Sequence, residues 1–358
     1  MFMTAMALSV CVPTAHLTTN RSAVELSIER DITEAVEAIN AAQSFLLTCH
    51  IHPDGDALGS TLAMAHGLIS KGKKVVATFP DPFVVPESLV KTLPGTELLR
   101  ESSEVLRAGE HFDVAMTFDC GSRTRLTGLE PLLDSADVFI NVDHHLSNER
   151  FGTINVISVE AASSGSVVLK IFDACGIALT KESAQCMYVA LLTDTGRFQF
   201  SSTTPDVFEQ AKRLSQFDLP IAEMSRSLTE EDSFAFLTLA GEALSVMERD
   251  EESNVVSATV TIDMQQAHGV SYDETEALIE YVRRAKECDV ACVVKEYLPG
   301  DYRVSLRSLG IIDVCQVAQA RGGGGHRYAA GFSSTQSPQE IIQSVRDDVV
   351  TQRAKIAQ

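Results

Sequence analysis

Strand-length segments rich in apolar residues alternate with helical patterns through the first part of this chain. The strand-like segments span residues 45–49, 74–79, 114–118 and 138–142. The last two read as continuous apolar runs, which are typical of a parallel sheet with both faces covered by helices. The helical patterns that supply these layers span residues 57–71, 164–175 and 182–192. The alternation predicts an α/β fold with a doubly wound, mainly parallel sheet.

The pattern changes in the last third of the chain. Strand patterns there span residues 255–262, 291–297 and 302–309. A helical pattern at 272–286 begins with a capping box formed by Ser271 and Glu274, and Pro338 marks the start of another helix. At 358 residues, two domains are the natural expectation. We expect a disordered leader over residues 1–27 and a doubly wound domain over residues 28–210. A helical linker over residues 211–240 and a smaller α+β domain over residues 241–358 follow.

Acidic and histidine side chains stand where the apolar segments end. The most unusual group is Asp143-His144-His145, which follows the run at 138–142 in a chain with only nine histidines. Three other segments deliver the same residue types at their ends: His50, Asp54, Asp56, Asp119 and Asp194. Because neighbouring strand ends lie about 5 Å apart at one edge of a parallel sheet, we expect these groups to converge.

The converging residue types predict a site for two metal ions. Carboxylate and imidazole ligands without thiolate suit hard or borderline ions such as Mn²⁺ or Mg²⁺. Two ions about 3.5–4 Å apart can stabilise both the attacking and the leaving oxygen of a phosphoryl displacement. Asp119 is the candidate for the carboxylate that bridges them. Taken singly, the segments also allow structural roles, with Asp56 as a helix N-cap, Asp119 as a turn residue and Asp194 as a helix cap.

A second signal lies near the C-terminus, in Arg321-Gly322-Gly323-Gly324-Gly325-His326-Arg327. Backbone N–H groups of consecutive glycines can surround phosphate or carboxylate oxygens, and the flanking cations add charge. A flexible surface linker is the alternative interpretation. Arg303 and Arg307 share one face of a predicted strand, where they either join this site or point to solvent.

Charge and cysteine content limit the possible functions. The formal net charge of −20 argues against a long nucleic-acid groove, which requires a basic surface. It allows a small phosphorylated substrate that bound cations hold. The eight cysteines lack Cys-x-x-Cys spacing, which favours reduced thiols and a cytoplasmic location. The first twenty residues lack Lys and Arg, and their apolar part is too short to span a bilayer, so we expect no membrane association.

Together these motifs resemble the DHH phosphoesterase superfamily and its DHH-associated second domain, from about residue 28 to about residue 350. Within it, the chain is similar to the nanoRNase/pAp phosphatases, especially actinobacterial members that hydrolyse cyclic di-AMP and its linear product. The matching segments are His52-Pro53-Asp54-Gly55-Asp56-Ala57-Leu58-Gly59-Ser60, Asp143-His144-His145-Leu146-Ser147-Asn148, Asp194-Thr195-Gly196-Arg197-Phe198 and Gly323-Gly324-Gly325-His326.

The resemblance implies a role for each residue. His50 and Asp54 would hold one Mn²⁺, a second set of Asp56, His144 and Asp194 would hold the other, and Asp119 would bridge them. Mg²⁺ or Co²⁺ could replace Mn²⁺. His145 would contact the scissile phosphate, and Asp143 would orient the histidines. Substrate phosphate or base would be bound by Arg307, Gly323, Gly324, Gly325 and His326.

The implied activity is hydrolysis of short nucleotides: oligoribonucleotides of a few residues, pAp, or cyclic di-AMP and pApA. The resemblance also implies a homodimer. A single-strand exonuclease of the recombination type is an alternative, although it would need a longer and more basic chain. A non-catalytic nucleotide sensor is another alternative, which loss of a metal ligand would favour. Inorganic pyrophosphatases use a similar metal set but do not carry the glycine run followed by histidine.

Overall fold

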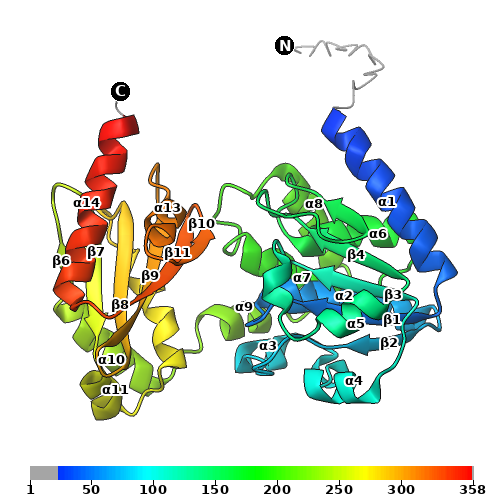
Figure 1. Cartoon of the computed structure of the whole chain (residues 1–358), viewed down its shortest axis with the longest axis horizontal. Coiled ribbons are helices and arrows are strands. Elements are labelled where there is room, and N and C mark those ends of the chain that lie inside the picture. The colour runs from blue at the N-terminus through cyan, green and yellow to red at the C-terminus, as the bar shows by residue number, and fades with distance from the viewer. Residues whose placement is uncertain (1–22, 357–358) are drawn as a thin grey trace, which may run out of the picture. The chain divides into compact units, whose positions relative to one another are not determined.

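The computed structural model describes residues 23–356, which form two compact units that divide between Glu230 and Glu231 (Figure 1). This division falls inside the segment 211–240 that we expected to be a separate linker. Helices α8 (Pro205–Ser215) and α9 (Ile221–Thr229) belong to the first unit, and α10 (Phe234–Ser245) belongs to the second. Residues 1–22 of the expected leader lie outside the described part, whereas residues 23–27 begin helix α1 (Ala23–Ala41).

The first unit contains a five-stranded sheet with strand order β2-β1-β3-β4-β5, and every pairing is parallel. The strands are β1 (Ser44–Cys49), β2 (Lys74–Ala77), β3 (Val114–Phe118), β4 (Val138–Asp143) and β5 (Ile154–Ile157). All five residues of β3 are buried, as are the last five of both β1 and β4. The doubly wound parallel sheet that the apolar runs predict is therefore confirmed.

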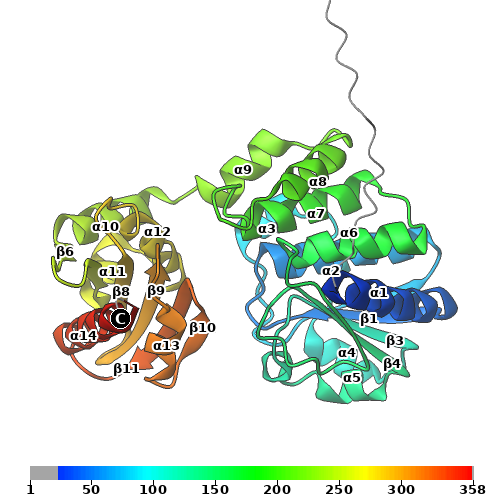
Figure 2. The same ribbon diagram turned by 90° about the horizontal axis from the view of Figure 1, so that it is seen from above.

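Helices cover both faces of this sheet (Figure 2). One face packs against α1, α2 (Gly55–Ser70), α6 (Ser164–Cys175) and α7 (Lys181–Asp194). The opposite face packs against α4 (Ser102–Ala108) and α5 (Glu130–Ser135). Successive residues of one strand enter different cores: Leu47 faces the first layer and Leu46 the second. Shorter elements are α3 (Glu87–Thr92), η1 (Thr96–Leu98) and η2 (Arg123–Leu126).

Helices α2 and α7 approach each other closely because glycine lies at their contact. A Cβ atom on Gly59 would lie 2.6 Å from the backbone oxygen of Cys186 and 3.1 Å from the Cβ of Ala190. A Cβ atom on Gly55 would lie 2.5 Å from the side chain of Thr193. These contacts fix the start of α2 beside the end of α7, where several of the expected metal ligands lie.

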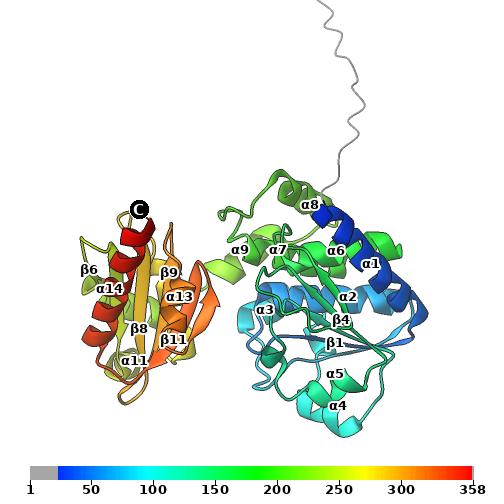
Figure 3. The same cartoon turned by 45° about the horizontal axis from the view of Figure 1, so that its top comes forward.

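The second unit contains a six-stranded mixed sheet with strand order β10-β11-β9-β8-β7-β6. The strands are β6 (Glu248–Arg249), β7 (Val255–Val260), β8 (Val290–Leu298), β9 (Asp301–Ser308), β10 (Gly324–His326) and β11 (Ala329–Ser334). One face packs against α10 and α12 (Leu278–Val282), with α11 (Ile262–His268) at β8. The other face packs against α13 (Val314–Gln319) and α14 (Pro338–Ile356) (Figure 3). The expected smaller α+β domain is confirmed.

The segment 272–286 differs from the single helix that its pattern predicts. It forms the 3₁₀ helix η3 (Asp273–Ala277) followed by the short helix α12. The expected capping contacts do form, because the Ser271 backbone N–H donates to Glu274 and the Glu274 N–H lies 3.4 Å from the Ser271 hydroxyl oxygen. Local capping therefore starts a helical segment here without setting its length or type. Across residues 23–356, no helix combines the length and apolar character required to cross a bilayer.

Candidate metal centre

The acidic and histidine side chains singled out in the sequence gather at the carboxyl edge of the first sheet. His50 follows β1, Asp119 follows β3, and Asp143 is the last residue of β4. Asp194 arrives from the end of α7. Two three-residue ligand sets, each with its ligand atoms within 4.8 Å, consist of His50, Asp54 and Asp119, and of Asp56, His144 and Asp194. A third group, Asp119, Asp143, His144 and His145, overlaps both sets. The convergence expected from the strand ends therefore occurs.

Asp119 lies between the two sets and presents a different oxygen to each. Its Oδ2 lies 3.4 Å from Nε2 of His50, and its Oδ1 lies 3.5 Å from Nε2 of His144. His144 Nε2 also lies 3.1 Å from Asp194 Oδ2 and 3.7 Å from Asp56 Oδ2. The backbone φ of Asp119 is +54°, a left-handed conformation uncommon for non-glycine residues and enriched at functional sites. This geometry fits a carboxylate that bridges two cations.

Asp54, not Asp56, caps helix α2, so the alternative role considered for Asp56 is wrong. Asp54 Oδ1 accepts hydrogen bonds from the backbone N–H groups of Asp56 and Ala57, at 3.1 and 3.0 Å. Its Oδ2 faces Nε2 of His50 at 3.9 Å. An N-cap accepts from the first helical N–H groups, which fixes its side chain. The cap thus also orients one oxygen of Asp54 towards the first ligand set.

Asp56 is fully buried and is held by a different helix. Its Oδ2 accepts from the N–H of Ser164 at 2.6 Å, and its Oδ1 accepts from the N–H of Gly165 at 2.9 Å and from the Ser60 hydroxyl at 3.1 Å. Ser164 and Gly165 begin α6, where the N–H groups and the helix dipole favour an anion. The start of α6 therefore fixes a carboxylate that the loop after β1 contributes.

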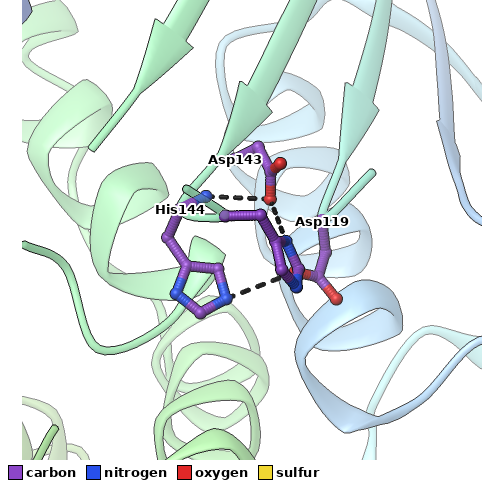
Figure 4. Close-up of side chains that lie close together, drawn as sticks. Asp119, Asp143 and His144 are labelled. Atoms are coloured by element: carbon purple, nitrogen blue, oxygen red, sulfur yellow. Dashed lines mark hydrogen bonds and ion pairs between the residues drawn. The ribbon is translucent and has the colours of Figure 1, made fainter. Parts of the chain in front are cut away.

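Asp143 contacts both histidines that follow it, and Figure 4 shows its contact with His144. Its Oδ1 accepts from the backbone N–H of His144 at 2.8 Å and lies 2.7 Å from Nδ1 of His145. Its Oδ2 accepts from the Asn148 side-chain amide at 2.6 Å. A carboxylate that binds one imidazole nitrogen fixes the ring's orientation and raises its basicity. This is the geometry expected of an orienting residue.

Residues that sequence reasoning had not selected complete the cluster. The Ser164 hydroxyl donates to Asp119 Oδ1 at 3.2 Å, and Asn148 supports Asp143. Arg125, in η2, places Nη2 2.9 Å from Nδ1 of His50. Asn148 lies inside the Asp143–Asn148 motif quoted above, and Ser164 begins a helix predicted from the sequence. The sequence therefore contained a signal for each of these two residues. Arg125 had none, because its contact depends on how two loops pack.

Burial and mutual repulsion shift the proton affinities of the carboxylates. Burial raises the pKa of Asp56, and it raises the pKa of Asp194 to about 7. Burial also acts to raise the pKa of Asp119, but hydrogen bonds with His144 and His50 outweigh it and hold that pKa well below its usual value. Burial acts to lower the pKa of His144, whereas Asp119, Asp56 and Asp194 raise it to about 10. Divalent cations would supply positive charge that favours the ionised carboxylates of this cluster.

The donor chemistry fits hard or borderline divalent ions. Every member of the two sets offers a carboxylate oxygen or an imidazole nitrogen. Burial raises the pKa of the nearby Cys49 thiol well above its usual value and that of Cys120 to about 12, so neither provides thiolate at neutral pH. Oxygen and nitrogen ligands of this kind suit Mn²⁺ or Mg²⁺.

The glycine run lies in the second unit and is part of its sheet. Gly324–His326 forms strand β10, which pairs antiparallel with β11, so the alternative of a flexible linker is wrong. A Cβ atom on Gly323 would lie 2.2 Å from the backbone oxygen of Gly331, and one on Gly325 would lie 2.5 Å from that of Ala329. The glycines therefore permit close backbone packing. The side chain of His326 lies outside the described part of the structure.

The two arginines of β9 have different partners. Arg307 Nε lies 3.3 Å from Glu280 Oε1, while Arg303 Nη1 donates to Asp301 at 2.7 Å. Arg303 also stacks its guanidinium over the Tyr297 ring, 4.9 Å from the centroid. The two side chains are thus ion-paired, not simply solvated.

Comparison with known proteins agrees with this architecture. Residues 44–191 match the DHH family, N-terminal domain, and residues 252–352 match the DHHA1 domain. The chain therefore belongs to the DHH family and carries a DHHA1 domain as its second unit.

Within that family, the chain is similar to the oligoribonuclease and pAp phosphatase branch. It is 28% identical over 327 residues to the Thermus thermophilus protein named bifunctional oligoribonuclease and PAP phosphatase NrnA. The matched region covers 89% of this chain and 94% of that relative. It is 24% identical over 298 residues to a probable protein of the same name from Streptococcus mutans, covering 83% and 91%. An exopolyphosphatase-related protein from Bacteroides fragilis shares the fold, with a TM-score of 0.85, 24% identity and coverage of 92% and 98%.

Proposed function

We propose that the protein is a two-metal phosphoesterase that hydrolyses short nucleotides. The substrates are one or more of nanoRNA degraded from its 3′ end, pAp, and cyclic di-AMP with its linear product pApA. The observation that carries this proposal is the position of Asp119, whose two oxygens face two separate ligand sets. Relatives named oligoribonuclease and PAP phosphatase support the choice of short substrates.

In this proposal each ligand set holds one Mn²⁺, with Mg²⁺ or Co²⁺ as substitutes. His50 and Asp54 belong to one ion, a second set of Asp56, His144 and Asp194 belongs to the other, and Asp119 belongs to both. Bound ions of this kind lower the pKa of water and stabilise charge on phosphoryl oxygens. His145, held by Asp143, contacts the scissile phosphate. In the second unit, Arg307, Gly323, Gly324, Gly325 and His326 bind the rest of the substrate.

Charge and thiol chemistry support the remaining assignments. A net charge of −20 suits a short substrate, which needs few phosphate contacts outside the metal site. It disfavours a single-strand exonuclease of the recombination type, and the complete ligand set disfavours a non-catalytic sensor. Every cysteine in the described residues is a free thiol, which supports a cytoplasmic protein. The family resemblance supports a homodimer.

A product time course tests the proposed function. The full chain with Mn²⁺ is incubated with pAp, pApA, cyclic di-AMP and a five-residue oligoribonucleotide, and products are separated by chromatography. We expect AMP from at least pAp or pApA, and transient pApA if cyclic di-AMP is also cleaved. The absence of turnover on all four substrates with Mn²⁺, Mg²⁺ and Co²⁺ would contradict the proposal.

Divalent cations should stabilise the first unit. A cation relieves the repulsion among Asp54, Asp56 and Asp194, and binding only to the folded state adds about 2.7 kcal/mol at 100 times the dissociation constant. For a unit of this size we expect the melting temperature to rise by roughly 5 °C with Mn²⁺ and to fall again with excess EDTA. Differential scanning calorimetry measures this shift. Asp194→Asn should reduce it, and an unchanged melting temperature in the native protein would contradict the metal assignment.

A further inference from the structure

A lysine is buried in the sheet of the second unit. The side chain of Lys295, on β8, is 1% exposed, and its register partner across β9 is Arg303. Its ammonium pairs with Oε1 of Glu276 and lies 5.4 Å from the centroid of the Tyr272 ring. Burial lowers the pKa of Lys295, which the Glu276 carboxylate opposes. A buried cation is costly to maintain without an anionic partner, so this position requires one.

Lys295 lines a cavity of about 390 Å³ that the second unit forms by itself. Cations, hydroxyls, glycine backbone, the Glu276 carboxylate and two aromatic rings, those of Tyr272 and Phe332, surround it. The lining includes Tyr272, Lys295, Arg303, Ser305, Gly323 and Ser333. Positive charge and hydroxyl donors are groups that bind phosphate, whereas the N–H groups of Gly322 and Gly323 already donate to the backbone oxygens of Gln319 and Ala318. The volume is near the lower end of ligand pockets and suits one nucleotide unit, not a long strand.

One helical segment supplies acidic partners to two cations of the sheet. Glu276, in η3, pairs with Lys295, and Glu280, in α12, lies 3.3 Å from Arg307. The Glu276 side chain is 52% exposed, whereas that of Lys295 is 1% exposed. The carboxylate can therefore move into solvent, while the ammonium is fixed. An anion entering the cavity can take the place of Glu276 beside Lys295.

We propose that Lys295 recognises the terminal phosphate of a nucleotide substrate, which replaces the Glu276 carboxylate as its partner. This inference rests on the proposed function, and it makes Lys295 a specificity-determining residue for 5′-phosphorylated substrates. A terminal phosphate carries a charge near −2 at neutral pH against −1 for the carboxylate, and it offers three acceptor oxygens. The exchange therefore favours a phosphorylated ligand over an unphosphorylated one.

The test compares the diadenylates pApA and ApA, which differ only in the 5′-phosphate. Lys295→Met should raise KM for pApA by about 10- to 100-fold, the range for loss of a charge-assisted hydrogen bond. It should leave KM for ApA and both kcat values within about twofold. Glu276→Gln removes the competing anion and should lower KM for pApA about threefold or more. Lys286→Met, which removes an exposed lysine of the same unit, is the matched control and should change neither KM.

Several outcomes would overturn the inference. An equal rise in KM for pApA and ApA in Lys295→Met would show a structural role for Lys295. A rise in KM for pApA in Glu276→Gln would show that the ion pair supports the cavity and does not compete with substrate. If the native protein cleaves neither diadenylate, calorimetric binding of AMP and adenosine tests the inference separately from the proposed function. Weaker binding of AMP but not of adenosine in Lys295→Met supports it, and equal changes refute it.

Discussion

Replacing Asp119 with Asn should reduce metal-dependent turnover of pAp by about 10³-fold or more, the scale seen when a central catalytic group is removed. The carboxylate gives one oxygen to each ligand set, 3.4 Å from His50 and 3.5 Å from His144. Asn preserves the volume but removes the negative charge and replaces one oxygen by an amide nitrogen, which repels a cation. A steady-state assay across Mn²⁺ concentrations measures the loss.

The variant should remain folded, because Asn fits the same space and its oxygen can still accept from the Ser164 hydroxyl. Circular dichroism and thermal unfolding check this point. Asp137→Asn provides the matched control, since Asp137 is exposed and contacts only His111 among the ion pairs found for it. Near-native Mn²⁺-dependent activity in Asp119→Asn would refute the bridging role.

Replacing Gly59 with Val should destabilise the first unit by about 3 kcal/mol or more. The added side chain meets the backbone oxygen of Cys186, which cannot rotate away. Helices α2 and α7 must then separate, which moves Asp56 away from Asp194. Urea unfolding should show a lower midpoint, and calorimetry should show weaker Mn²⁺ binding.

Gly241→Ala is the control for this substitution. Gly241 is also helical, in α10, but a Cβ atom there would meet nothing within 4 Å. Alanine is the better helix former, so this change should be neutral or stabilising by up to about 1 kcal/mol. If Gly59→Val unfolds at the same urea concentration as the native protein, the close contact between α2 and α7 does not govern stability.

The fold of the first unit could largely be predicted from the sequence, because the general properties of buried parallel sheets apply to it. Apolar strand segments specify a buried parallel sheet, and the carboxyl ends of its strands meet at one edge. His50, Asp119 and Asp143 each stand at such an end, so their convergence follows from topology alone. The division of Asp54 and Asp56 between two ligand sets came from the family resemblance and not from topology, because it depends on which of them caps α2 and which is held by α6.

Contacts between elements distant in the chain account for what was missed. Arg125 reaches His50 through the packing of two loops, and no local pattern in the sequence marks it. Lys295 stands in a strand where a charged residue would be expected to face solvent, yet the fold places η3 over it. The length of the helix after Ser271 was also misjudged, since its capping contacts fix where it begins and not how far it continues.

The dispersal of the ligands along the chain has a consequence for synthesis of the protein. A nascent polypeptide that has left the ribosome as far as β4 contains His50, Asp54, Asp56 and Asp119, but not yet α6 or α7. It therefore lacks both the N–H groups that hold Asp56 and the carboxylate of Asp194. Assembly of the second ligand set must therefore wait until translation has passed α7 and that helix has docked.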